Sequence, residues 1–320
     1  MKNFKGNERR VGFEIEFQNL SPKTTAELVA KITDGKVSRI SDASYKVESN
    51  AGDFICETDA KLLKELAKSS DQNIKIDKFD FEGVVKDILG PLTKELVPTE
   101  IVSPPLVESN FSIISKIEAA LLENGAKGTN ESAHFAFAAQ FNPEIEKNES
   151  DYILNVLRSY ILLTDWLRSQ IYIDFSRKLT SYIDDFPKKY ALKVLQSDYT
   201  PSLEQLIDDY LEFNPTRNRG LDFLPLFLFL DEKRVRKVVK DERVKSRPTF
   251  HYRLPSCQIG LESWHIFIEW KRWLLLEKLA KDTSYLDKMT QAYLKLNDST
   301  SLNFGQKWLN ECNHFIEDFR

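Results

Sequence analysis

An alternation of apolar and acidic residues near the start of the chain is its most restrictive feature. Residues 11–17 read Val-Gly-Phe-Glu-Ile-Glu-Phe. Side chains of a β-strand point alternately to its two faces, so this pattern predicts a strand with one core face and one acidic face. Glu14 and Glu16 then share a face, roughly 6.5–7 Å apart along the strand. Such a pair suits two divalent cations bridged by phosphates, although a merely solvated face gives the same pattern.

The length and composition indicate a folded protein with a large core. The chain has 320 residues, of which 42% are hydrophobic. We expect one elaborated domain over residues 1–320, with mainly strands in 1–149 and mainly helices in 150–320. In the helical part, apolar residues recur at intervals of three and four from Ser150 onward, which predicts a long amphipathic helix.

Charge and cysteine content exclude several classes of protein. The formal net charge is -4, which argues against a nucleic-acid partner because such proteins carry basic patches. The longest apolar run, residues 221–230, is too short to span a bilayer, so no membrane partner is expected. The three cysteines have no metal-binding spacing and cannot all pair. These features predict a cytoplasmic protein.

Further acids follow the opening strand in the first half of the chain. A hairpin is predicted over residues 44–58, with its turn at Asn50-Ala51-Gly52, and it leads to Glu57 and Asp59, which are again two residues apart. Glu100 lies in a short apolar strand that is stopped by two prolines. An unpaired buried carboxylate is costly, so Glu100 must face water or a positive partner.

Four blocks of sequence, in this order, resemble the amidoligase family. They are Gly-Phe-Glu-Ile-Glu-Phe at 12–17, the strand with Glu57 and Asp59, Pro-Thr-Glu-Ile-Val-Ser-Pro-Pro at 98–105, and Arg-Pro-Thr-Phe-His-Tyr-Arg-Leu-Pro at 247–255. That family is related to glutamate–cysteine ligase and glutamine synthetase. The resemblance implies an α+β fold, in which a curved, mostly antiparallel sheet of the glutamine synthetase-like type is joined to a helical C-terminal half.

The same resemblance implies a binding site for ATP with Mg²⁺ or Mn²⁺ on the concave face of that sheet. Glu16 and Glu100 would hold one metal ion, and Glu14 would contribute to the second. Glu57 and Asp59 would line the nucleotide site. Carboxylates are the hard oxygen ligands that such ions need when they bridge phosphates.

The chain departs from the family pattern where relatives place a metal-binding histidine. If Asn142-Pro143-Glu144 anchors the alignment, Gln140 replaces that histidine. A second register would use His134 instead. The two residues are about 20 Å apart along a strand, so only one of them can lie at the metal.

Two later segments contribute basic residues. Arg219 belongs to an Arg-Asn-Arg segment that is suited to bind an anionic substrate, although an ordinary polar loop has the same composition. A returning strand near 248–255 would place His251 and Arg253 on one face. By resemblance, Arg253 would contact the transferred phosphoryl group, and His251 replaces a metal-binding acid. Histidine suits Mn²⁺ better than Mg²⁺.

The sequence therefore predicts an ATP-dependent ligase that joins a carboxylate substrate to an amine substrate through an acyl phosphate. A peptide or peptide-like acceptor is the family-level expectation. Gln140 and His251 motivate an alternative, a catalytically degenerate relative that binds a nucleotide or a peptide. A metal-dependent amide hydrolase is a weaker third hypothesis, because histidines suited to a metal site are few.

Overall fold

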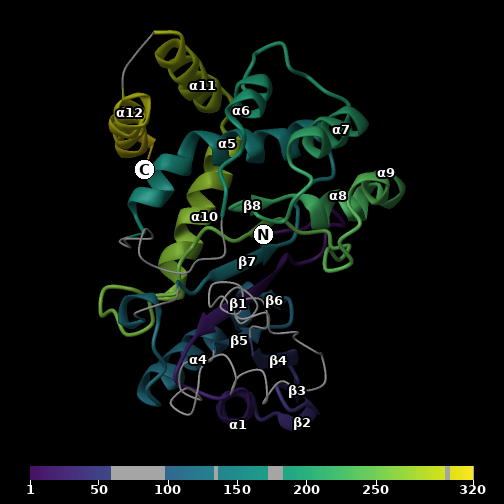
Figure 1. Cartoon of the computed structure of the whole chain (residues 1–320), viewed down its shortest axis with the longest axis vertical. Coiled ribbons are helices and arrows are strands. Elements are labelled where there is room, and N and C mark those ends of the chain that lie inside the picture. Colours follow the sequence, from purple (N-terminus) through teal and green to yellow (C-terminus); the bar gives the residue numbers. More distant parts are fainter. Residues whose placement is uncertain (59–97, 133–135, 172–182, 300–302, 320) are drawn as a thin grey trace, which may run out of the picture.

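The computed structural model describes residues 1–58, 98–132, 136–171, 183–299 and 303–319. Strands and short helices make up the first half of this chain, and helices dominate the second half, as predicted (Figure 1). The strands are β1 (Arg10–Phe17), β2 (Lys36–Ser41), β3 (Ser44–Ser49), β4 (Gly52–Thr58), β5 (Thr99–Val102), β6 (Leu106–Val107), β7 (Ala139–Pro143), β8 (Leu221–Asp222) and β9 (His251–Tyr252). The helices are α1 (Pro22–Thr33), α4 (Ser112–Glu123), α5 (Ser150–Ser169), α6 (Lys188–Val194), α7 (Leu203–Phe213), α8 (Leu224–Leu230), α9 (Glu232–Val238), α10 (Ile266–Lys281), α11 (Thr283–Asp298) and α12 (Phe304–Phe319), with 3-10 turns η1 (Glu108–Asn110) and η2 (Thr129–Glu131).

Strand β1 is the centre of a nine-stranded antiparallel sheet formed by the described residues. The strand order is β2-β3-β4-β5-β1-β7-β9-β8, and β6 pairs with the first residues of β1. Both edges of β1 are therefore hydrogen-bonded, by β5 on one side and β7 on the other. The predicted α+β class, with an antiparallel sheet and a helical C-terminal half, is confirmed.

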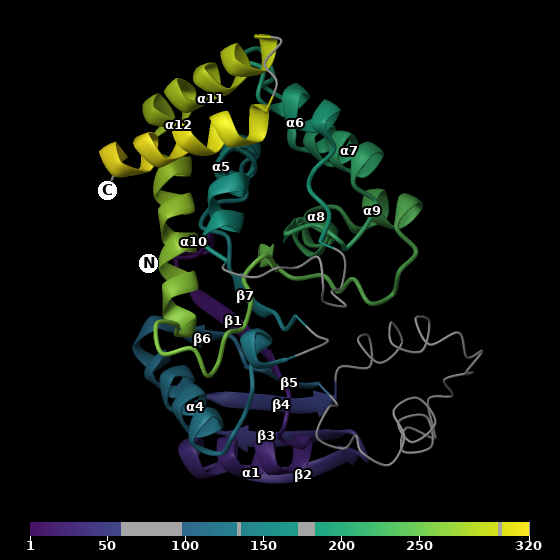
Figure 2. The same ribbon diagram turned by 60° about the vertical axis from the view of Figure 1, so that its left-hand side comes forward.

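The two faces of β1 differ as the alternation predicts. Phe13 and Ile15 are 0% and 1% exposed, whereas Glu14 and Glu16 are half-buried. The Phe13 ring makes edge contacts with Phe111 and Phe267, at centroid distances of 5.0 and 6.0 Å. Figure 2 shows α4 and α10 along one side of the sheet, which is the side of these apolar residues. The core of the sheet is therefore on this face.

Local sequence signals account for the first helix and the hairpin. The Ser21 hydroxyl accepts a hydrogen bond from the Thr24 amide at 3.1 Å and caps α1, whose first residue is proline. Asp34, in the left-handed region with a φ of 49°, ends the helix. The predicted hairpin over 44–58 is confirmed as β3 and β4.

The helical half packs around α5. This helix has 20 residues and contacts α10, α11 and α12, so the predicted long helix from Ser150 is confirmed. The returning strand predicted near 248–255 is shorter than expected, because β9 contains only His251 and Tyr252. Tyr252 pairs with Phe141 of β7 on one side and with Leu221 of β8 on the other. The buried apolar residues of both halves form one continuous cluster.

A buried ion pair ties the start of β1 to α10. Arg9 and Glu277 are each 3% exposed. Arg9 Nη1 donates to Glu277 Oε2 at 2.8 Å, and Nη2 contacts the other carboxylate oxygen. Burial works to lower the pKa of Arg9, but the Glu277 carboxylate outweighs it and the pKa is raised. Arg9 is therefore held as a cation against α10.

None of the helices in the described ranges is long and apolar enough to cross a membrane.

Candidate functional site

Three carboxylates lie in a row across neighbouring strands. Glu57 of β4 is directly opposite Glu100 of β5, and Glu100 is directly opposite Glu16 of β1. Residues that are directly opposite in antiparallel strands share a face, with Cβ atoms about 4.5–5.5 Å apart. Glu14 lies two residues before Glu16 and so shares this face. All four acids are half-buried. The sheet therefore gathers four predicted site residues on the face opposite Phe13.

Strand β7 and the residue before it supply amide donors to the two acids of β1. Gln140 Nε2 donates to Glu16 Oε1 at 2.8 Å, and the Ala138 backbone amide donates to Glu16 Oε2 at 2.8 Å. Asn142 Nδ2 donates to Glu14 Oε1 at 2.8 Å. The pairing of β1 with β7 places Gln140 opposite Glu14 and Asn142 opposite Gly12, so both amides lie on the acidic face. The two carboxylates are thus held in fixed positions.

The other end of the Gln140 amide contacts two basic side chains. Its Oε1 atom accepts from Arg253 Nε at 3.3 Å and lies 2.9 Å from His251 Nε2. The three residues are buried, with 5–7% of their surface exposed. His251 Nδ1 lies 3.5 Å from Oδ2 of Asp222, a fully buried residue whose other oxygen accepts from the Leu224 amide. Gln140 therefore links Glu16 of β1 to a buried cluster of basic residues.

The charges around Glu14 stabilise its ionised form. Burial works to raise the pKa of this carboxyl. His251, the Asn142 amide, Arg247 and Arg253 act in the opposite direction and outweigh burial, so the pKa lies below its ordinary value. Arg247 Nη1 is 3.8 Å from Glu14 Oε1. A cavity of about 310 Å³ lies beside Glu14, and Asn142 and Arg247 also line it.

The structure brings together most of the residues predicted for the site. Seven of them share the acidic face or contact a residue on it: Glu14, Glu16, Glu57, Glu100, Gln140, His251 and Arg253. Asp59 and His134 lie outside the described residues. The individual roles of all these residues stay predictions.

Arg219 is placed differently from the other predicted residues. It donates to Asn214 Oδ1 and to the Asp185 carbonyl, both at 2.9 Å, and its guanidinium lies 5.9 Å from the centre of the Phe186 ring. These contacts join two loops and do not involve the acidic face. Its catalytic role stays a prediction, to which these contacts add no support.

Arg217 is nearer to the basic cluster. Its backbone carbonyl accepts a hydrogen bond from Arg253 Nη1. Its side chain is half-buried, and burial, followed by the positive charge of Arg253, lowers its pKa. The guanidinium of Arg217 is therefore close enough to that of Arg253 for the two positive charges to repel each other.

Sequence reasoning missed Asn142, Asp222 and Arg217. Asn142 could have been found, because it lies two residues after Gln140 and therefore on the same strand face. The signal at Asp222 was its position just before the helix that begins at Leu224, where an aspartate side chain can accept a hydrogen bond from the backbone amide two residues on, as Asp222 does from Leu224. The choice of Arg219 over Arg217 depends on the loop conformation, which the sequence pattern does not determine.

The acidic face provides suitable ligands for Mg²⁺ but no closed metal site. Among the described residues, no three His, Cys, Asp or Glu side chains form a group that could hold a metal ion. Mg²⁺ is usually held by one or two carboxylates together with waters and substrate phosphates, so Glu14, Glu16 and Glu100 fit this ion. His251 fits less well, because its two ring nitrogens face Gln140 and Asp222.

Comparison with known proteins gives one match. A family model described as "Putative amidoligase enzyme" matches residues 7–275. No curated protein and no solved structure matches the chain. The matched range contains β1, β4, β5, β7 and β9, the strands that carry the acids, the amides and the basic residues described above.

Proposed function

The chain belongs to the amidoligase family, and from this premise we propose that it is an ATP-dependent ligase that joins a carboxylate to an amine through an acyl phosphate. Membership of this family supports a ligase-type activity in general. The finer proposal is supported by one observation, the position of Gln140 between Glu16 on one side and His251 and Arg253 on the other. Phosphoryl transfer from ATP needs both kinds of group, acids to hold cations and fixed positive charge beside the phosphoryl group.

In the proposed first step, the substrate carboxylate attacks the γ-phosphorus of ATP. A carboxylate O–P bond forms, and the bond from the γ-phosphorus to the bridging oxygen of ADP breaks. Arg253 would contact the transferring group, where a planar guanidinium can donate two hydrogen bonds. Glu14, Glu16 and Glu100 would hold the Mg²⁺ or Mn²⁺ ions, which neutralise charge on the phosphates.

In the second step, the amine nitrogen attacks the carbonyl carbon of the acyl phosphate. The C–N bond forms, the bond from carbon to the phosphate oxygen breaks, and the amine gives up a proton. The products are an amide, ADP, phosphate and one proton. No nucleophilic side chain is needed, so the protein acts by positioning the substrates and stabilising charge.

Binding of the nucleotide is tested first, because it needs neither substrate to be known. A ligand that binds only the folded state stabilises it, by about 2.7 kcal/mol at a concentration of 100 Kd. We expect Mg–ATP to raise the melting temperature, and Glu16→Ala to abolish the rise. Glu123→Gln, on an exposed residue at the end of α4, is the control and should keep it. No stabilisation of the unmodified protein by Mg–ATP or Mn–ATP would contradict the proposal.

A second candidate function is nucleotide or peptide binding without turnover. It is favoured by the hydrogen bond between His251 and Gln140, because these two side chains face each other where the resemblance implies metal ligands. ADP release separates the two functions. A ligase releases ADP and phosphate when acid and amine mixtures are added with Mg–ATP, whereas a binding protein releases none under the same conditions.

A further inference from the structure

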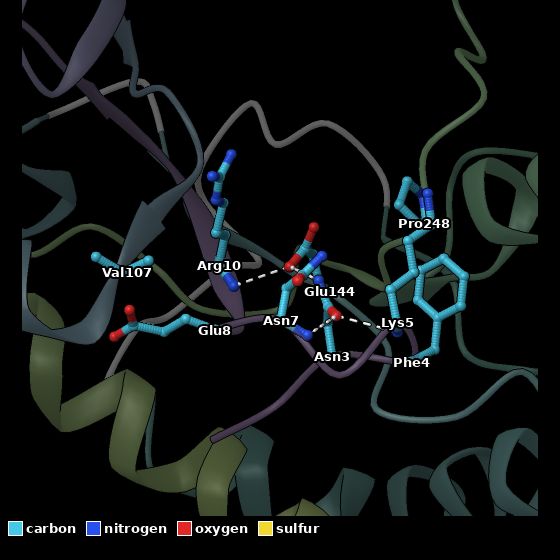
Figure 3. Close-up of a pocket in the computed structure, with 9 residues that line it drawn as sticks. All are labelled: Asn3, Phe4, Lys5, Asn7, Glu8, Arg10, Val107, Glu144 and Pro248. Carbon is cyan, nitrogen blue, oxygen red and sulfur yellow. Dashed lines mark hydrogen bonds between the residues drawn. The ribbon is translucent and has the colours of Figure 1, made fainter.

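A second cavity opens beside the start of β1, outside the site described above. Its volume is about 500 Å³, within the range of small-molecule sites (Figure 3). Its charged lining residues are Lys5, Glu8, Arg10 and Glu144. Two positive and two negative side chains balance, so the cavity suits a zwitterion better than a polyanion such as a nucleotide.

One wall of this cavity is a turn fixed by its own hydrogen bonds. Asn3, which is 8% exposed, accepts hydrogen bonds on Oδ1 from the backbone amides of Lys5 and Asn7, both at 3.0 Å. Gly6 has a φ of 75°, a conformation that favours glycine. The Phe4 ring packs edge-on against Phe229 at 5.7 Å. The wall is therefore formed before any ligand arrives, which reduces the entropic cost of binding.

Glu144 has one oxygen held by the protein and one that is available. Its Oε2 atom accepts from Asn3 Nδ2 and from the Arg10 backbone amide, both at 3.0 Å. Its Oε1 atom accepts no hydrogen bond from the described residues. In the view of Figure 3, Glu144 lies between Arg10 and Lys5. The Arg10 side chain is exposed and makes no hydrogen bond or ion pair within the described chain.

The two cavities have a common boundary. Glu144 and Pro248 line both the 500 Å³ cavity and the 310 Å³ cavity beside Glu14. A molecule in the larger cavity would thus adjoin the acidic face across Glu144. A second substrate needs this arrangement, since its reactive group must reach an intermediate that is formed in the neighbouring site.

We propose that the larger cavity is the amine-substrate subsite, and that it takes an amino acid or the amino-terminal residues of a peptide. Glu144 Oε1 binds the ammonium group, and Arg10 binds a substrate carboxylate with a planar fork of donors. The assignment of the bound amine as a substrate rests on the proposed ligase function. Binding of the amine itself is independent of ATP.

The test is calorimetric titration of the full chain with alanyl-alanine, without nucleotide. The blocked forms N-acetyl-alanyl-alanine and alanyl-alanine amide are titrated in parallel. We expect acetylation of the amine to weaken binding at least tenfold, and Glu144→Gln to weaken binding of the free dipeptide to the same extent. Glutamine retains an oxygen that accepts from Asn3 and Arg10, so this variant should fold.

Arg10→Gln gives a second variant, on an exposed side chain, that tests the other end of the ligand. This variant should bind alanyl-alanine at least fivefold more weakly than the unmodified protein, and it should bind alanyl-alanine amide with unchanged affinity. Glu123→Gln is the control and should bind like the unmodified protein. Any one of three results would overturn the assignment. These are equal binding of the free and the acetylated dipeptide, binding of alanyl-alanine by Glu144→Gln that is as tight as that by the unmodified protein, and no binding of alanyl-alanine at millimolar concentration.

The outcome is separable from that of the ligase proposal. Glu144→Gln should keep the stabilisation by Mg–ATP, because its carboxylate is not among the acids assigned to the metal ions. If Mg–ATP stabilises neither the unmodified protein nor Glu144→Gln while the dipeptide binds as described, the amine site stands and the ligase proposal fails. If Mg–ATP stabilises the protein and the dipeptide does not bind, the assignment of the amine subsite fails, whereas the nucleotide-binding part of the ligase proposal stands.

Discussion

Gln140 donates its amide Nε2 to Glu16 Oε1 at 2.8 Å, across the pairing of β7 with β1. The amide oxygen of the same side chain faces His251 and Arg253. An amide donates at one end and accepts at the other, so glutamine satisfies an acid and two basic groups at once. This bond fixes the relative position of the two charged groups on which the proposed function depends.

Removal of an acid from β1 should separate function from folding. Glu14→Ala and Glu16→Ala each remove a half-buried carboxylate, so we expect a folded protein that Mg–ATP no longer stabilises. Phe13→Ala, on the opposite face, should instead lower the free energy of unfolding by about 3–5 kcal/mol. Thermal shift with Mg–ATP and urea unfolding measure the two effects. Full nucleotide stabilisation in both glutamate variants would mean that this face is simply solvated.

Glu14 should contribute to stability in a pH-dependent way. Its pKa in the folded protein lies below the ordinary value of 4.5, so the ionised form is favoured by folding. The contribution is fully present above the unfolded-state pKa and is lost as the pH falls through the folded-state pKa. Urea unfolding of the unmodified protein and Glu14→Gln should therefore differ most above about pH 5 and converge on acidification. A difference that grows below pH 4.5 would contradict the direction of this shift.

His251→Glu should make stability depend on a metal ion. The new carboxylate would face the Gln140 oxygen and lie near buried Asp222, so it adds an unpaired charge that costs about 3–5 kcal/mol. If position 251 can join the acids of β1 as a ligand, Mg²⁺ should restore most of the lost melting temperature. His251→Gln adds no charge and serves as the control, with no rescue expected. Loss without rescue in His251→Glu would assign His251 a purely structural role.

Arg253→Lys should be nearly as damaging as Arg253→Ala. Lysine keeps the charge, but it cannot both contact Gln140 as Nε does and reach the Arg217 carbonyl as Nη1 does. Loss of one contact to a transferring group costs about 2.7–4 kcal/mol in the barrier, or two to three orders of magnitude in rate. The rate of ADP release measures this loss.

Arg217→Ala provides the comparison for Arg253, since its carbonyl would remain and only its guanidinium would be removed. We expect weaker Mg–ATP stabilisation in Arg217→Ala than in the unmodified protein. Arg39→Ala, on a largely exposed side chain paired to Asp42 after the edge strand β2, is the control and should leave nucleotide binding unchanged. Equal stabilisation in all three proteins would remove Arg217 from the site.

Arg9 and Glu277 should stabilise the fold mainly because each neutralises the buried charge of the other. Arg9→Met alone leaves the Glu277 carboxylate buried, which should cost about 3–5 kcal/mol. The double variant Arg9→Met/Glu277→Leu removes both charges and should recover most of that loss. Urea unfolding of the four proteins of this double-mutant cycle gives the coupling between the two side chains. A double variant as unstable as the sum of the single variants would contradict this account.

The faces of β1 could be predicted because they depend only on local alternation. The hairpin β3–β4 and helix α5 were also predicted from local patterns, a turn sequence and an amphipathic repeat. Strand β2 was missed, since an edge strand with polar, exposed residues has no apolar alternation to reveal it. Strand β7 spans Ala139–Pro143, and the sequence pattern alone does not determine these bounds, because they depend on the pairing of β7 with β1.

The candidate site was predictable only in part, for a related physical reason. Acids on one strand can be recognised from their spacing in the sequence. Their amide partners come from another strand, whose register is set by tertiary pairing. Gln140 was found through the family resemblance, whereas Asn142 was overlooked as part of a strand-ending Asn-Pro-Glu motif. Arg217 and Arg219 are alike in sequence, and only the fold of their loop separates them.

The site is assembled from segments that leave the ribosome at very different times. Gln140 and His251 are 111 residues apart, so at about 5–20 residues per second β7 waits roughly 5–20 s for its partner β9. During that interval β7 is an unpaired edge next to β1, the kind of edge that recruits strands from other chains. Lower growth temperatures, and chaperones that shield nascent strands, should therefore improve the recovery of soluble protein. A fragment that ends before β9 would keep this edge open permanently.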